Sequence, residues 1–223
     1  MLSVFAFVDR LRFDFLSIYV FQVPVSFGLP FGHTTLRTAV ATMSMTPDQV
    51  LDKVAAGESL EGEVLRNINL VGAELANANF SGCDLTGADL SDAELSGANF
   101  RGADISKAIF TQANLTEVDL SDVKAHAADF SEANLEGAFL VEGQFEMASF
   151  NLAELSGADL SEADFMGADF TEASLNGATL NGSDFSNANL TAADMTDAEA
   201  SDTVFTDATL DEIIGFEVPD DEY

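Results

Sequence analysis

The 223-residue chain has no tryptophan, a single cysteine, and only eight lysine and arginine residues against 39 aspartate and glutamate residues. The lone Cys83 excludes a disulfide within the chain. The formal net charge of -31 disfavours direct binding to nucleic acid, because phosphates and carboxylates have the same sign. No stretch predicts a transmembrane helix. The composition therefore favours a protein that binds neither nucleic acid nor membrane and that attracts basic partners.

Sequence motifs for catalysis and metal binding are also missing. The chain contains no HExxH, no glycine-rich phosphate loop, no EF-hand loop and no calcium-binding nonapeptide repeat. Its two histidines, His33 and His126, are far apart in sequence. The many carboxylates recur at fixed repeat positions, which is typical of a solvated surface. We therefore predict that the protein is not an enzyme and holds no cofactor or metal.

The chain does contain a five-residue repeat. Of the 31 positions taken every fifth residue from Leu60 to Leu210, 27 are leucine or phenylalanine. Two residues before these positions, 22 of the 28 slots from 73 to 208 hold alanine. Asparagine or aspartate commonly precedes the leucine or phenylalanine, and serine or threonine usually follows it. A period of five fits neither an α-helix nor a β-strand, so the repeat indicates another way of winding the chain.

The motif Ala-(Asp/Asn)-(Leu/Phe)-(Ser/Thr)-(Gly/x), which runs over residues 58–212, resembles the pentapeptide-repeat family. The resemblance implies an all-β solenoid, a right-handed quadrilateral parallel β-helix with four pentapeptides per coil. At that coil length the repeat corresponds to about eight coils. The resemblance also implies that the central Leu or Phe and the small residue two positions before it point inward.

A second period, of 20 residues, supports four sides independently of the motif. Leucine and phenylalanine segregate into separate series when every twentieth residue is read. This segregation predicts ladders of like side chains inside the solenoid, each buried side chain contributing about 1.5–3 kcal/mol before the entropy cost. Two such series are Leu75, Leu95, Leu115, Leu135, Leu155 and Leu175, and Phe110, Phe130, Phe150 and Phe170.

Both ends of the repeat carry segments that we expect to cover it. The run Thr46-Pro47-Asp48-Gln49 predicts the start of a short capping helix within residues 43–57. At the other end, residues 213–223 form a C-terminal cap and an acidic tail. The apolar residues expected to cover the last coil are Ile213, Ile214, Phe216 and Val218.

Residues 1–42 form a phenylalanine-rich leader without the five-residue phase. The favoured interpretation is a gene-start error, with translation beginning at Met43 or Met45. The alternatives are a targeting segment with a cleavage site at 39–41, and a genuine extension. We expect this leader to be disordered. A start error predicts a cytoplasmic protein, whereas a signal segment predicts an exported one.

Acidic residues recur at one phase of the 20-residue period and form the first part of a candidate interaction surface. We expect them to line one edge of the solenoid, with two further carboxylates on the adjoining face, whereas a purely solubilising role is the alternative. Another edge would carry a second series, Asp92, Glu132, Glu172 and Glu212. The candidate acidic residues are Asp122, Glu142, Glu162 and Asp202, together with Asp119 and Asp159.

Apolar residues at outward slots within 124–152 form the second part of this candidate surface. Phe139 and Val141 flank Leu140 where polar residues are usual, and Met147 and Leu152 occupy outward slots nearby. An exposed apolar patch can mark an interface. Sequence drift, or a local bulge that buries these side chains, is the alternative.

These features predict a non-enzymatic protein that presents a rigid acidic surface to a partner protein with a basic surface. The family resemblance also implies a DNA-mimic modulator of DNA gyrase or topoisomerase, since some members resemble duplex DNA in shape and charge. Against that alternative, the sequence shows no loop insertion between coils and no long C-terminal dimerisation segment. The other alternative is a structural scaffold with solubilising acidic faces. A homodimer through one end of the solenoid is a further expectation.

Overall fold

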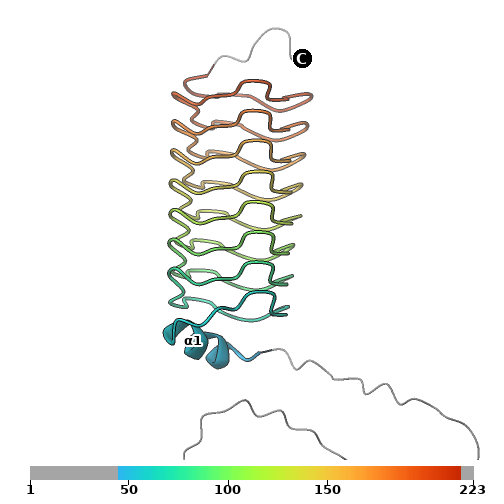
Figure 1. Ribbon diagram of the computed structural model, residues 1–223. Coiled ribbons are helices and arrows are strands. Elements are labelled where there is room, and N and C mark those ends of the chain that lie inside the picture. Colours follow the sequence, from blue (N-terminus) through green and yellow to red (C-terminus); the bar gives the residue numbers. More distant parts are fainter. Residues whose placement is uncertain (1–44, 217–223) are drawn as a thin grey trace, which may run out of the picture. The chain divides into compact units, whose positions relative to one another are not determined.

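Residues 45–216 are described by the structure, a computed structural model, in which a short helix precedes a stack of similar coils (Figure 1). The expectations for the leader 1–42, for Val218 and for the acidic tail lie outside these residues. Within them, the chain repeats the same two-residue turn and single bridge residue every five residues from Glu61 to Ile214.

Helix α1 spans Pro47–Ala55 and covers the first coil. Both halves of the capping box are present: the Gln49 amide donates to Thr46 Oγ1 at 3.3 Å, and the Thr46 amide donates to Gln49 Oε1 at 2.9 Å. Val50 is fully buried and belongs to the same core as the coils. Lys53 Nζ lies 3.3 Å from Glu63 Oε1 and so joins α1 to the first coil.

The coils are held together by 27 parallel β-bridges among the described residues, each joining a residue to the one 20 positions later. One residue of every five-residue unit forms such a bridge, so no strand extends beyond a single bridge. One coil therefore takes four five-residue units. The bridge residues form column one from Val64 to Val204, column two from Asn69 to Thr209, column three from Glu74 to Ile214, and column four from Asn79 to Glu199.

Backbone hydrogen bonds between coils fix this register. For example, the Leu115 amide donates to the Asn134 carbonyl at 2.7 Å, and the Asn134 amide donates to the Ala113 carbonyl at 3.0 Å. The same pair of bonds recurs along the four columns. Because nearly every backbone donor in the ladder has a partner, the coil can bury its backbone without forming a continuous sheet.

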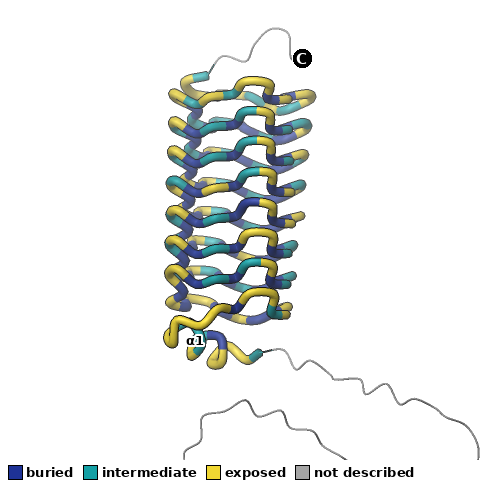
Figure 2. The backbone as a smooth tube through the Cα atoms, in the orientation of Figure 1, coloured by how far each residue is buried: buried dark blue, intermediate teal, exposed yellow. Residues whose placement is uncertain are grey.

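The interior holds the central residue of each unit and the small residue two positions before it, as the repeat predicts. Every central side chain from Leu60 to Met195 is at most 2% exposed. The small residues between them are also buried, and burial alternates with exposure along each coil (Figure 2). The narrow interior explains the alanines, because larger residues at these slots would collide with the central side chains.

Phenylalanine ladders run along two sides of the core, which confirms the series read at period 20. In the ladder from Phe110 to Phe170, successive ring centroids are 4.9, 4.9 and 4.7 Å apart with nearly parallel planes. The neighbouring ladder contacts it edge to face, as between Phe145 and Phe150 at 5.7 Å. Both geometries are favourable for aromatic pairs. Gly143 makes room for Phe145, because a Cβ at that slot would collide with the ring.

The C-terminal end differs from the prediction at Ile214. Ile213 and Phe216 pack against the core, and the Phe216 ring lies 5.9 Å from that of Phe205. The Ile214 side chain, however, is 51% exposed, so the expectation that it covers the last coil is wrong. The physical reason is register: Ile214 bridges to Asp194 and so takes an outward slot.

Phe150 tests the ladder, because its ring stacks on Phe130 and Phe170 and touches Phe145 and Phe165. We expect Phe150→Ala to lower the free energy of unfolding by about 3–5 kcal/mol, since it removes a fully buried ring and leaves a cavity. Phe150→Leu should cost about half of that or less, because leucine already occupies this side of the core elsewhere. Denaturant unfolding followed by circular dichroism measures both. A cost below about 1 kcal/mol for the alanine variant would contradict the ladder.

Candidate interaction surface

Tight turns between the bridge columns carry many of the acidic side chains. In each five-residue unit the second turn residue has a left-handed backbone, with φ between 53° and 60° for the non-glycine residues. Glycine, asparagine and aspartate tolerate this region best, although glutamate and lysine also occur here. Side chains at this position point away from the core and most of them are exposed.

The predicted stripe occupies this turn position between columns four and one. Asp122, Glu142, Glu162 and Asp202 are all exposed and recur at intervals of 20 residues, with Gly182 between the last two. Because Gly182 lacks a side chain, an open hollow lined by its neighbours separates Glu162 from Asp202. The stripe is therefore continuous from Asp122 to Glu162 and then interrupted by one coil.

Asp122 differs from the rest of the stripe. Arg101 Nη2 lies 2.6 Å from its Oδ2, across one coil. Within residues 45–216, Glu142, Glu162 and Asp202 make no ion pair. Within the stripe, these three carboxylates are therefore the ones that no basic side chain of the described residues neutralises.

Column four holds the other predicted surface residues. Asp119, Phe139 and Asp159 are successive bridge partners, and the Phe139 side chain is 49% exposed. Its amide donates to the Val118 carbonyl at 2.9 Å, and the Leu120 amide donates to the Phe139 carbonyl at 2.7 Å. The ladder is unbroken at this rung, so a local bulge that buries Phe139 is excluded. Val141 is half-buried in the turn that follows.

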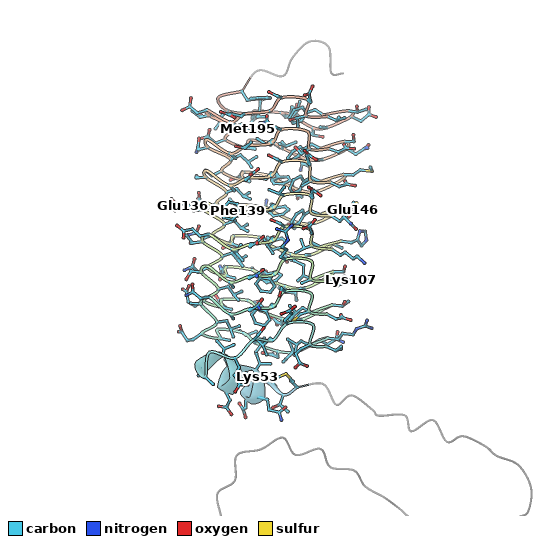
Figure 3. All side chains as sticks on the ribbon, in the orientation of Figure 1. Lys53, Lys107, Glu136, Phe139, Glu146 and Met195 are labelled. Carbon is cyan, nitrogen blue, oxygen red and sulfur yellow. The ribbon has the colours of Figure 1, made fainter. Side chains whose placement is uncertain are left out.

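The other outward apolar residues belong to different sides of the stack. Met147 lies in the turn between columns one and two, and Leu152 in the turn between columns two and three. Figure 3 shows Phe139 and Glu136 on one side, and Glu146 and Lys107 on the opposite side. The four apolar residues of segment 124–152 therefore do not form a single patch. The second acidic series, at the turn position of Leu152, is likewise interrupted by this residue.

Basic residues are confined to one side of the stack. The five lysine and arginine residues in 45–216 lie in α1, in column one, or in the two turns that border column one. Columns two, three and four and the turns between them carry carboxylates and no lysine or arginine. The 20-residue period could have revealed this asymmetry if basic residues had been sorted by phase. The five residues are Lys53, Arg66, Arg101, Lys107 and Lys124.

Local contacts shift the pKa of several groups. Burial raises the pKa of Asp164, and the nearby Glu146 and Asp184 carboxylates raise it further. Burial also acts on Asp84, but hydrogen bonds from Thr86 and Arg66 outweigh it and lower the pKa. Burial raises the pKa of the Cys83 thiol to about 11, and its Sγ donates to the Leu60 carbonyl at 2.9 Å. Cys83 is therefore a small core residue at neutral pH and not a nucleophile.

Neither a metal cluster nor a membrane span is found in the part of the chain that the structure describes. Among residues 45–216, no three His, Cys, Asp or Glu side chains come together as metal ligands. In the same residues, no helix has the length and apolarity needed to cross a bilayer.

Comparison with protein families identifies the repeat. The family model for pentapeptide repeats matches in eight copies over residues 59–92, 83–122, 93–130, 128–167, 148–187 and 168–207. The chain therefore belongs to the pentapeptide-repeat family, and its coils form a right-handed β-helix solenoid. Comparison with curated proteins finds no match.

Solved structures with the same solenoid include forms of QnrB1, a plasmid-mediated fluoroquinolone resistance protein. One trypsin-treated QnrB1 variant is 26% identical, with 69% of this chain and 82% of that chain covered and a TM-score of 0.55. A second is 27% identical, with 68% and 81% covered and a TM-score of 0.57. HetL, a pentapeptide repeat protein from the cyanobacterium Nostoc sp., is 24% identical over 80% of this chain and 99% of its own, with a TM-score of 0.36.

Leu152 tests the left-handed turn, since it has φ 57° and a side chain that is 44% exposed. We expect Leu152→Gly to raise the free energy of unfolding by about 0.5–1 kcal/mol, because relief of backbone strain outweighs the extra entropy of glycine in the unfolded chain. Thermal and urea unfolding would measure the change. Ala153→Gly at the next, buried slot is the matched control and should destabilise. Destabilisation by Leu152→Gly would show that side-chain packing, and not strain, dominates at this turn.

Proposed function

We propose that this protein is a non-enzymatic interaction module whose acidic surface binds a partner protein through a basic surface. The observation that carries the proposal is the stripe in the turn between columns four and one, where Glu142, Glu162 and Asp202 are exposed and make no ion pair within residues 45–216. Column four, beside it, carries carboxylates and no lysine or arginine among the described residues. A surface of one sign steers an oppositely charged partner toward it and repels nucleic acid. A role in the cytoplasm is part of the proposal.

Rigidity supports this function. The four bridge columns correspond to a four-sided solenoid of about eight coils, with neighbouring coils about 4.8 Å apart. Stacked phenylalanine rings and regular backbone hydrogen bonds hold the carboxylates in this spacing. Such a preordered surface loses little conformational freedom when a partner binds, so more of the interaction energy appears as affinity.

The stripe between columns four and one can be tested by charge reversal. In the triple variant Glu142→Lys, Glu162→Lys and Asp202→Lys, we expect loss of the partner that wild-type protein captures, measured by affinity capture and quantitative mass spectrometry. Lysine is compatible with the left-handed turn, because Lys107 already adopts it with φ 59°. The matched control Asp92→Lys, Glu132→Lys and Glu172→Lys makes the same charge change at the same turn position on another side. Capture that survives the first triple reversal would leave only a solubilising role for the stripe.

A second candidate function is modulation of DNA gyrase by mimicry of duplex DNA. It is supported by the likeness to QnrB1, with TM-scores of 0.55 and 0.57 and identities of 26% and 27%. The rod of coils and its regularly spaced carboxylates fit this function. The bridge pattern is unbroken from Val64 to Ile214, so no loop is inserted between the described coils. Any binding of gyrase by this protein would therefore have to use the faces of the coils and not inserted loops.

If gyrase is the partner, micromolar protein should inhibit supercoiling, or protect gyrase from a fluoroquinolone, in a plasmid supercoiling assay. The effect should weaken as salt rises, because it depends on opposite charges. The stripe variant described above should lose the effect, whereas its matched control should retain more of it. Wild-type protein without any effect on supercoiling or drug sensitivity would eliminate this second candidate and leave the general interaction function in place.

A further inference from the structure

Phe139 is an aromatic side chain on a face that is otherwise polar. Column four contains asparagine, aspartate, threonine and glutamate at its other rungs. Phe139 is 49% exposed and its bridge partners on the two sides are Asp119 and Asp159. Phe139 therefore occupies an outward rung between those of Asp119 and Asp159, and Figure 3 shows it near the middle of the stack.

The surroundings of this ring are acidic. Glu136 lies in the turn before column four and Glu142 in the turn after it, and both are exposed. Column four and the turn between columns three and four carry no lysine or arginine among the described residues. Val141, two residues further along the chain, is half-buried in the turn after column four. An occupant of this site must therefore offer both positive charge and a flat surface that packs on a ring.

The two flanking carboxylates each keep one oxygen for such an occupant. Asp119 Oδ1 accepts from the Ser121 amide at 2.9 Å, and Asp159 Oδ1 accepts from the Ser161 amide at 3.0 Å. No hydrogen bond or ion pair within residues 45–216 uses Oδ2 of either side chain. Their backbones are two rungs apart, a span of about 9.6 Å for parallel neighbours.

An arginine side chain satisfies these conditions better than a lysine. The guanidinium group is planar, stacks on aromatic faces, and directs several N–H donors outward in its plane toward carboxylates. A lysine ammonium has no plane to stack and holds its hydration more strongly. We propose that Phe139, Asp119 and Asp159 form a docking site for an arginine side chain of the partner protein. This inference rests on the proposed interaction function and names the residue type recognised.

The test compares fluorescent hexa-arginine and hexa-lysine peptides as probes, with affinities measured by fluorescence anisotropy. Wild-type protein should bind hexa-arginine more tightly than hexa-lysine. Phe139→Ile should weaken hexa-arginine binding by about two- to fivefold, the range for an exposed cation–π contact, and should affect hexa-lysine less. Isoleucine is compatible with the slot, because Ile109 occupies the equivalent slot in column two between Asp89 and Asp129.

Two further variants separate the aromatic ring from general apolar contact and from its particular rung. Ile109→Ala removes an exposed apolar residue, also between two aspartates, and should leave both affinities unchanged. Thr179→Phe places a ring between Asp159 and Glu199 in column four and should restore hexa-arginine binding in the Phe139→Ile background. Amide chemical shifts that change on titration with hexa-arginine should cluster at positions 119, 139 and 159.

The outcomes separate this site from the wider function. Equal hexa-arginine affinity of wild-type protein and Phe139→Ile, or shift changes away from column four, would overturn the arginine site. Salt-dependent binding of both peptides in that case would leave the acidic interaction surface standing. If neither peptide binds at low ionic strength, the arginine site and the proposed function both fail.

Discussion

The parallel backbone pairing between each residue and the one 20 positions later determines the rest of this structure. It places a residue of each five-residue unit in a bridge column and forces a left-handed turn shortly before it. The same pairing brings equivalent side chains of successive coils into contact, so that a residue type repeated at period 20 becomes a stack. Core and surface are thus two consequences of one register.

Inside, the register converts phenylalanines that are 20 residues apart into stacked rings, such as Phe130 on Phe150. Outside, it aligns carboxylates with the same spacing in columns, and the sequence positions of the five basic residues in 45–216 place them on one side. A shift of one residue would bury charges and expose the rings, so the strong alternation of apolar and polar residues protects the register.

Much of this fold could be predicted from the sequence, because the positions that define it follow short periods. The capping box at Thr46 and the inward leucines and phenylalanines depend on neighbours within a few residues or on the repeat itself. The C-terminal cap and the candidate surface were less predictable. The exposure of Ile214 depends on how far the coils continue, and the pairing of Arg101 with Asp122 depends on the reach of a long side chain across one coil. A pattern of neighbouring residues in the sequence predicts neither of these two features.

Stability, solubility and the docking of a partner are three possible reasons for so acidic a surface, and the positions of the charges help to distinguish them. Stacked carboxylates repel one another: burial and the carboxylates nearby raise the pKa of Asp164. A raised pKa in the folded state means that ionisation of this group destabilises the fold at neutral pH, and that the destabilisation disappears as pH falls through the folded pKa. Ionisation of Asp164 therefore does not serve stability, whereas hydrogen bonds from Ser96 and from Thr196 lower the pKa of Glu94 and of Asp194, so that ionisation of these two groups stabilises the fold. Solubility needs net charge but does not require the basic residues to gather on one side. Sides without basic residues favour the proposed docking of a basic partner, because the surface potential there has one sign.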